Sequence, residues 1–189
     1  MNENLLCGDL VRLTHEEPET QARFESQWSA DSEYSRLLDW DPARRFSVKS
    51  AQKWIEKHYE REDTFAFSIR TLEKDELIGM IGLDSIRWNH RDAFVGIGLG
   101  ERAFWGKGYG TDAMKIILRY AFTELNLRRV TLDVFEYNSR GVRSYEKAGF
   151  IIEGRERKVI LREGRRWDLI FMGLLREDWI KQEQQKDIV

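Results

Sequence analysis

The sequence predicts a mixed α/β domain whose central sheet of about seven strands is covered by helices on both faces. The main observation is the order of the segments, β-α-α-β-β-β-α-β-α-β-β, in which strand patterns and amphipathic helix patterns alternate. The second observation is the size, since 189 residues with 41% hydrophobic content suit one domain with a sizeable core. No repeat, low-complexity segment or linker divides the chain, so residues 1–189 are expected to form a single domain.

The N-terminal half begins with an alternating segment, residues 10–13, that predicts a short strand. Pro18 and the acidic residues after it predict a helix that ends near Trp28, and the irregular stretch 32–46 predicts no element. Ser47 is placed to cap a helix that runs to about residue 60. Residues 65–72 and 77–86 read as a hairpin around a polar turn, and residues 93–99 as the next strand.

The C-terminal half alternates in the same way. Thr111 begins a helix that runs to about residue 124, and residues 129–135 follow as a strand. A short helix over 139–148 ends at Gly149, which suits a helix C-terminus. Residues 150–160 and 167–175 form a final hairpin, and the polar tail 176–189 predicts a frayed helix.

Composition excludes several classes of function. The net charge of −2 argues against general nucleic-acid binding, and no apolar stretch is long enough to cross a membrane. Cys7 is the sole cysteine, which suits a reducing cytosol, and the N-terminus shows no signal peptide. The three histidines are scattered, so no metal site is expected. We therefore expect a cytoplasmic protein without nucleic-acid, membrane or metal partners.

The most informative stretch is Trp105-Gly106-Lys107-Gly108-Tyr109-Gly110-Thr111, which lies between a strand and a helix. Alternating glycines allow several backbone N–H groups to approach one anion, and the helix N-terminus adds partial positive charge. The alternative is a tight strand-to-helix connection that binds no ligand, which is the better interpretation for a lone pair of glycines. The stretch is not a Walker P-loop, because Lys107 lies between the glycines rather than after them, and its glycine spacing is also not the G-x-G-x-x-G of a dinucleotide-binding loop.

The loop resembles the acyl-CoA loop of the GCN5-related N-acetyltransferase (GNAT) family, [Q/R]-x-x-G-x-[G/A]. Gly108 and Gly110 stand at the glycine positions, and Trp105 stands where Gln or Arg is usual. A second stretch, residues 138–150, resembles the family's N-x-x-A-x-x-x-Y-x-x-x-G-F signature, with Gly141 in place of Ala. The resemblance covers residues 65–175 and is strongest to the ribosomal-protein N-terminal and spermidine acetyltransferases.

The resemblance implies a mostly antiparallel sheet that is splayed between strands 93–99 and 129–135, with acetyl-CoA as cosubstrate in the opening. The residues implied in binding it are Ile97, Gly98, Leu99, Trp105, Gly106, Lys107, Gly108, Tyr109, Gly110, Thr111 and Asn138. A backbone N–H of the 97–99 segment would polarise the thioester, and the nearby glycines suggest a bulge there. Asn138 can equally serve as a helix cap.

The implied chemistry is direct attack of an amine on the thioester, because no nucleophile motif is present. Tyr145 would donate a proton to the leaving thiolate, although a core tyrosine is the alternative reading. Asp133 is the candidate general base, weighed evenly against a strand-surface role. Glu101 and Glu136 are weaker candidates.

The acceptor is expected to be an amine, either a peptide N-terminus or a small cationic molecule. The stretch 16–41 holds eight acidic residues against two arginines, and it would attract such a cation. Trp28, Trp40 and Trp88 are candidates to line the acceptor site. Two alternatives stay open, a longer acyl-CoA and a CoA-binding sensor without catalysis. The family and the exposed last hairpin suggest a homodimer.

Overall fold

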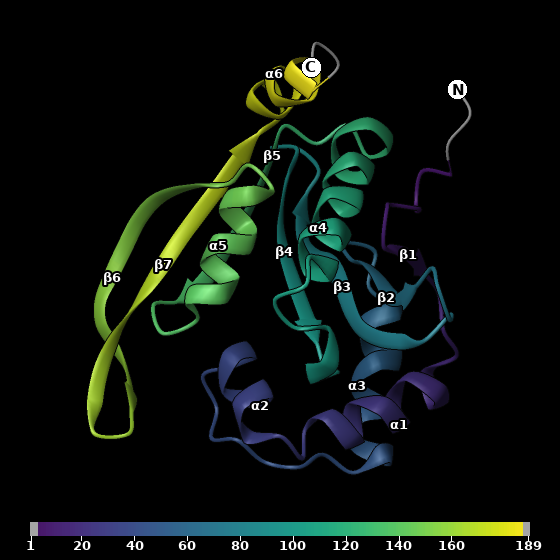
Figure 1. Cartoon of the computed structure of the whole chain (residues 1–189), viewed down its shortest axis with the longest axis vertical. Helices are drawn as coiled ribbons and strands as arrows, with labels where there is room; N and C mark the ends of the chain where they lie inside the picture. The colour runs from purple at the N-terminus through teal and green to yellow at the C-terminus, as the bar shows by residue number, and fades with distance from the viewer. Residues whose placement is uncertain (1–3, 187–189) are drawn as a thin grey trace.

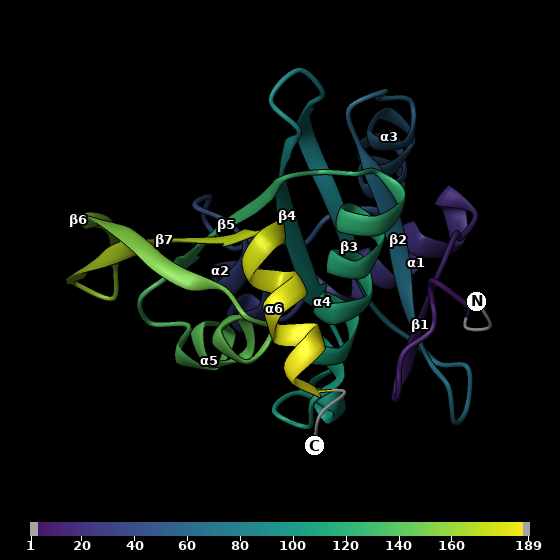
Figure 2. The same ribbon diagram turned by 90° about the horizontal axis from the view of Figure 1, so that it is seen from above.

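A computed structural model describes residues 4–186, which form a seven-stranded sheet with helices on both faces (Figures 1 and 2). The strand order is β1-β2-β3-β4-β5-β7-β6, and every pair is antiparallel except β4 with β5. The strands are β1 (Val11–Thr14), β2 (Phe65–Thr71), β3 (Leu77–Arg87), β4 (Asp92–Leu99), β5 (Arg129–Phe135), β6 (Ile151–Arg162) and β7 (Arg165–Leu175). The predicted mixed, mostly antiparallel sheet is confirmed.

The helices divide between the two faces of the sheet. One face carries α4 (Tyr109–Arg119), which continues as a π-helical turn to Glu124, and α5 (Ser139–Lys147). The other carries α1 (Pro18–Trp28) and α3 (Val48–Tyr59), which pack on each other through Ala22, Ala51 and Ile55. α2 (Ser32–Leu38) contacts β4, and α6 (Arg176–Lys186) follows β7. No helix among residues 4–186 is long and apolar enough to span a membrane.

The sheet opens between its two parallel strands. Their register joins Asp92 to Arg129 and ends with the pair Phe94–Thr131. Beyond that pair β4 and β5 separate, so residues 95–99 of β4 pair with β3 alone among the described strands. A strand edge without a neighbour leaves backbone N–H and C=O groups free to bind a ligand. This is the splay that the resemblance implies.

Three expectations need correction. The stretch 32–46 is not wholly irregular, because Asp31 caps α2 by accepting from the Glu33 N–H. The register of β3 with β4 is unbroken from Gly79–Leu99 to Asp84–Phe94, so no bulge lies at residues 97–99. The tail is also better anchored than expected, since Trp179 of α6 packs against the main core.

The hairpin β6–β7 extends away from the rest of the sheet and bends back at its tip toward α2 (Figure 1). Near the tip one guanidinium nitrogen of Arg162 donates to the backbone carbonyls of Asp39, Trp40 and Asp41, at 2.9–3.0 Å. At the turn, Glu163 pairs with Arg36 at 2.8 Å. The last hairpin therefore holds the segment that follows α2, which borders the site described next.

Candidate active site

The glycine loop ends on the N-terminus of α4, as the sequence predicts. Gly106 and Gly108 have φ of 72° and 96°, values that side-chain-bearing residues rarely adopt. Gly108 is the residue before the helix, and the N–H groups of Tyr109, Gly110 and Thr111 in the first turn have no acceptor within the helix. The loop thus presents a row of backbone donors at a helix N-terminus, an arrangement that suits a phosphate.

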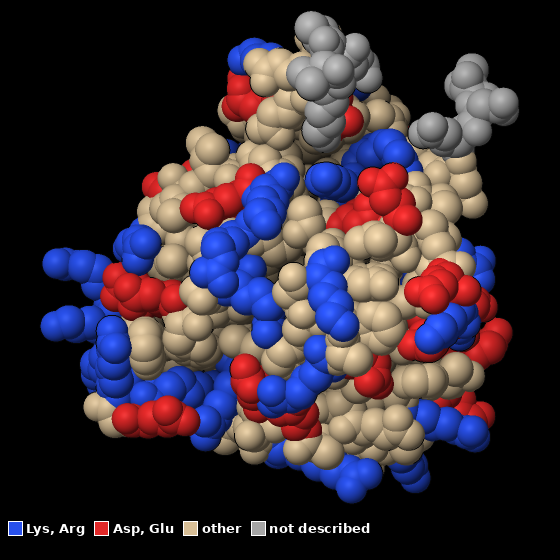
Figure 3. Space-filling model, in the orientation of Figure 1, with Lys and Arg blue, Asp and Glu red and all other residues tan. Residues whose placement is uncertain are grey.

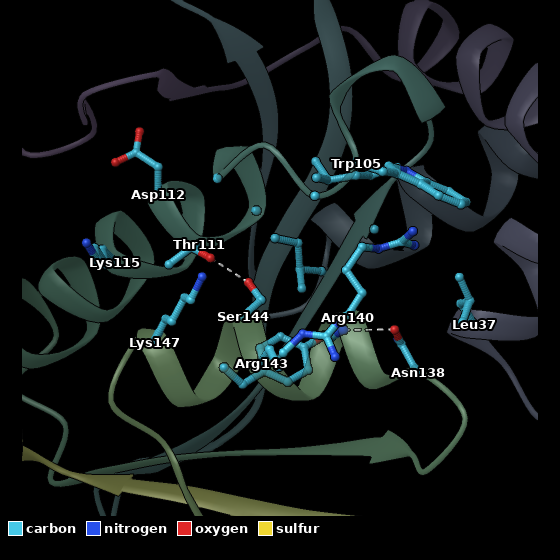
Figure 4. A pocket seen from close by; sticks show the side chains of 18 of the residues that line it. Leu37, Trp105, Thr111, Asp112, Lys115, Asn138, Arg140, Arg143, Ser144 and Lys147 are labelled. Carbon is cyan, nitrogen blue, oxygen red and sulfur yellow. Dashed lines mark hydrogen bonds between the residues drawn. The ribbon is translucent and has the colours of Figure 1, made fainter.

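These donors open into a cleft of about 450 Å³ between α4 and α5, here called the α4–α5 cleft. Of the residues predicted to bind the cosubstrate, most line it: Ile97, Gly98, Leu99, Trp105, Gly106, Gly108, Gly110, Thr111 and Asn138. Lys107 is exposed and Tyr109 packs edge-on against Phe104, so neither side chain lines the cleft. At its floor the hydroxyls of Thr111 and Ser144 lie 2.8 Å apart and join the two helices (Figure 4).

Basic side chains that the sequence analysis missed surround this cleft. Lys115 extends from α4, and Arg140, Arg143 and Lys147 extend from α5 (Figure 4). Over α4 and α5 the surface is accordingly blue at the centre of Figure 3. The spacing 140, 143, 147 places the α5 cations on one helix face, a signal that the sequence does contain. Together they give the cleft the charge that a polyphosphate ligand requires.

Trp105 fills the position where the family pattern usually has Gln or Arg. Its indole N–H donates to the Leu99 carbonyl at 2.7 Å, which fixes the ring beside the end of β4. The guanidinium of Arg140 lies 3.9 Å from the ring centre and so crosses the cleft from α5. The cation that position 105 itself lacks is therefore supplied from the opposite wall.

Tyr145 lies in the α4–α5 cleft, and its ring packs edge-on against Phe150. Burial raises the pKa of its hydroxyl to about 12, with a further contribution from the nearby charge of Asp133. Within residues 4–186 this hydroxyl makes no hydrogen bond. Because of its raised pKa the hydroxyl is protonated at neutral pH, and because it has no partner among these residues it is free to donate to a ligand. Asn138 caps α5 through its Oδ1, which accepts from the Gly141 N–H at 2.9 Å.

A second cavity, of about 500 Å³, lies on the other side of β4 and is here called the α2–α3 cavity. The two cavities share Tyr34, Leu38, Ile97 and Gly98, so they meet at the free part of β4. The apolar residues that line the second include Pro42, Phe46, Trp54, Met80 and Ile81, and its ionisable residues are Glu25, Tyr34, Asp39, Asp41, Arg44, His58 and Asp84.

Few of the acidic residues in the 16–41 stretch reach this cavity. Glu16 is paired with Arg70 at 2.5 Å, and Asp31 and Glu33 both pair with Arg102. Glu25, Asp39 and Asp41 are the members that line the cavity. The expectation for the tryptophans is wrong in detail, because neither cavity is lined by Trp28, Trp40 or Trp88, whereas Trp54 and Trp105 do line them.

The predicted bases lie in different surroundings. Asp133 lines neither cavity, and burial raises the pKa of its carboxyl, with a smaller contribution from the negative charge of Asp84. Glu101 accepts from the Trp28 indole at 2.8 Å, and Glu136 lies 3.5 Å from Arg155. Glu25 was missed because nothing in its sequence context separates it from the exposed acids around it. Among residues 4–186 no group of acids, histidines or cysteines is placed to hold a metal ion.

Comparison with known proteins places this geometry in context. The sequence profile of a family described as "Acetyltransferase (GNAT) domain" matches residues 10–151. The prophage-derived uncharacterized N-acetyltransferase YokL of Bacillus subtilis is 29% identical over 91% of this chain and 93% of its own length. Spermidine N(1)-acetyltransferase of Vibrio cholerae is 28% identical, over 85% and 80%. A crystal structure of spermidine N-acetyltransferase from Vibrio cholerae, in complex with CoA and spermine, superposes with a TM-score of 0.77 at 24% identity, covering 90% of this chain and 96% of that one.

Proposed function

The chain belongs to the GNAT family of acetyltransferases, and from this premise we propose that it transfers acetyl from acetyl-CoA to the primary amine of a small cationic acceptor with an apolar body. One observation carries the proposal: a phosphate-suited cleft and a separate cavity lined by acids and apolar side chains meet at the free edge of β4. A thioester and an amine bound on the two sides would face each other there.

The α4–α5 cleft fits acetyl-CoA in shape and charge. The loop N–H groups and the cations of α4 and α5 suit its phosphates, and Asn138 retains amide hydrogens for the pantetheine arm. The unpaired stretch of β4 offers a backbone N–H to polarise the thioester carbonyl. The nitrogen would attack that carbon, and as the C–S bond breaks the thiolate would take a proton from Tyr145.

The acceptor class rests on the lining of the α2–α3 cavity. Its carboxylates favour an ammonium group, and Phe46, Trp54 and Met80 favour an apolar body. The names of the spermidine-acetylating relatives also support a cationic amine. We expect a preference for amines such as 2-phenylethylamine over a linear polyamine, in which charged nitrogens divide the apolar chain into short methylene segments.

A panel assay tests this function. Purified protein is given acetyl-CoA and one of 2-phenylethylamine, butylamine, spermidine or a tripeptide with a free N-terminus, and thiol release is followed. Arms with propionyl-CoA and butyryl-CoA test the longer-acyl alternative. Acetylation of an amine with an apolar body is the expected result. Exclusive turnover of the tripeptide would move the acceptor class to protein N-termini, and CoA binding without any turnover would support a sensor.

Gly96 offers a steric probe of the α2–α3 cavity. It lines this cavity, and a Cβ built on it meets no atom within 4 Å. Gly96→Val should therefore fill acceptor space without straining the fold, at a cost of about 1–3 kcal/mol in acceptor binding, which is about 5- to 150-fold in KM. The affinity for CoA should not change.

Gly154→Val serves as the matched control, because Gly154 also has open space at its Cβ position but lies on β6 and lines neither cavity. Steady-state kinetics with both substrates varied make the comparison. An unchanged acceptor KM in a folded Gly96→Val protein would show that the amine binds elsewhere.

Assembly and location are also part of the proposal. We propose a cytoplasmic homodimer, which the exposed apolar side chains Ile151, Ile152 and Phe171 of the hairpin β6–β7 support. Light scattering over micromolar concentrations measures the oligomeric state directly.

A further inference from the structure

Glu25 is a partly buried acid of α1 that borders the α2–α3 cavity and has no cation beside it among the described residues. It lies in the last turn of α1, and among the described residues it makes no ion pair. Within residues 4–186 the one polar contact of its carboxylate is the Tyr34 hydroxyl, which donates to Oε1 at 3.2 Å and lies 3.5 Å from Oε2. Glu16 and Glu19, on or just before the same helix, are both paired with arginines. A carboxylate without a counter-ion that borders a cavity is free to receive a cation from it.

Tyr34 connects this carboxylate to the reaction point. Its side chain is buried, lines both cavities and lies against β4, where a Cβ built on Gly98 would be 3.0 Å from the hydroxyl. Gly98 belongs to the stretch of β4 that has lost β5 as a neighbour. One hydroxyl group therefore separates Glu25 from the backbone that would polarise the thioester.

The surroundings of Glu25 make it a stronger base than an exposed glutamate. Burial raises the pKa of its carboxyl to about 7, and the hydrogen bond from Tyr34 opposes part of that shift. A base with a pKa near the working pH combines a large ionised fraction with a strong affinity for the proton.

We propose that Glu25 is the catalytic base that takes a proton from the acceptor ammonium, with Tyr34 as the residue that positions its carboxylate. The inference rests on the proposed function and deepens it. One N–H bond of the ammonium breaks and an O–H bond forms on Glu25, which later releases this proton to solvent. The neutral amine then attacks the thioester. A second N–H proton leaves as the amide forms, and it replaces the proton that Tyr145 gives to the thiolate.

Two other candidate bases, Asp133 and His58, are less favourably placed for this step. Asp133 lines neither cavity, and the ring of His58 stacks on Trp54 at 4.7 Å. The charged and titratable groups that share the cavity with Glu25 are Tyr34, Asp39, Asp41, Arg44, His58 and Asp84. Of these, only Tyr34 contributes to the shifted pKa of Glu25.

The test is the pH profile of kcat/KM for the panel amine that the wild type acetylates best. The wild type should show a limb that rises through pH 7, because the base must be ionised. Glu25→Gln keeps the shape of the side chain, and it should lower kcat/KM about 10²- to 10⁴-fold and abolish the limb. Tyr34→Phe removes the hydrogen bond that stabilises the ionised form, so the limb should persist at a higher pH.

Two further variants test whether the effect is specific to Glu25 and whether Asp133 is the base instead. Glu19→Gln, on the same helix but exposed and paired with Arg23, should keep the wild-type rate and profile. Asp133→Asn removes the rival base and should keep the limb. If Glu25→Gln keeps the limb, or if Asp133→Asn removes it, the proposal is overturned.

A binding measurement separates failure of this inference from failure of the proposed function. Absence of turnover in the wild type with every panel amine rejects the function alone. Calorimetry of 2-phenylethylamine with the CoA-bound protein then tests Glu25, and Glu25→Gln should weaken binding at least tenfold at pH 8. Binding that is undetectable in the wild type, or equal in the two proteins, rejects the role of Glu25.

Discussion

Replacing Tyr145 by Phe should lower kcat about 10²- to 10⁴-fold while leaving CoA affinity and Tm almost unchanged. The expected loss is the contribution of a general acid, because the variant cannot donate a proton to the leaving thiolate. The expected constancy of the fold follows from the geometry. The hydroxyl of Tyr145 makes no hydrogen bond within residues 4–186, and the ring that packs against Phe150 is retained.

The matched control is Tyr120→Phe, because Tyr120 is also a partly buried tyrosine and packs on Phe65 and Phe67 away from both cavities. Its kcat should equal that of the wild type. A structural role for the Tyr145 hydroxyl predicts the reverse pattern, a lower Tm at a normal rate. Near-normal kcat in Tyr145→Phe would assign the thiolate proton to water or to the acceptor.

Replacing Asp112 by Ala should reduce the free energy of unfolding by about 2–4 kcal/mol and lower Tm by about 5–15 °C. Asp112 is a buried acid on α4, and its carboxylate accepts from the backbone N–H groups of Asp9, Leu10 and Val11 at 2.8–3.2 Å. Hydrogen bonds to a charged acceptor are each worth more than neutral ones, and alanine leaves these donors without a partner.

Thermal unfolding followed by circular dichroism measures the effect. Asp112→Asn should lose less, since its amide oxygen still accepts. Asp178→Ala is the control, because Asp178 is half-exposed in a pair with Lys181, and such pairs contribute about 0–1 kcal/mol. Equal Tm values for Asp112→Ala and the wild type would mean that the core alone holds β1 in place.

The periodic spacing of apolar residues made most helices and strands predictable, and the lack of such a pattern explains why α2 was not predicted. In α4 the buried residues recur at helical spacing, so the helix was found. In α2 a single residue, Tyr34, is buried, and the helix depends on its cap at Asp31 and on tertiary contacts. A seven-residue helix with one buried side chain has no pattern that a sequence can display.

The candidate site divides in the same way. The glycine loop, Asn138 and Tyr145 belong to short sequence motifs that can be recognised without a structure, and all of them lie along the α4–α5 cleft. The α2–α3 cavity is assembled from α1, α2, α3, β2, β3 and β4, so its lining depends on long-range packing. The raised pKa of Glu25 results from its burial, and burial depends on the folded chain and cannot be predicted from composition.

The contact between Arg162 and the segment 39–41 involves only main-chain oxygens of that segment. Any amino acid supplies the same carbonyl group, so the clamp is indifferent to the identity of the three side chains it secures. Two of them, Asp39 and Asp41, line the α2–α3 cavity. A substitution of Asp41 would therefore keep all three hydrogen bonds, whereas Asp39 has a further local role, because its Oδ1 accepts from the Asp41 N–H at 3.2 Å. At position 41, the anchoring of this loop and the chemistry of the proposed acceptor cavity can therefore evolve independently.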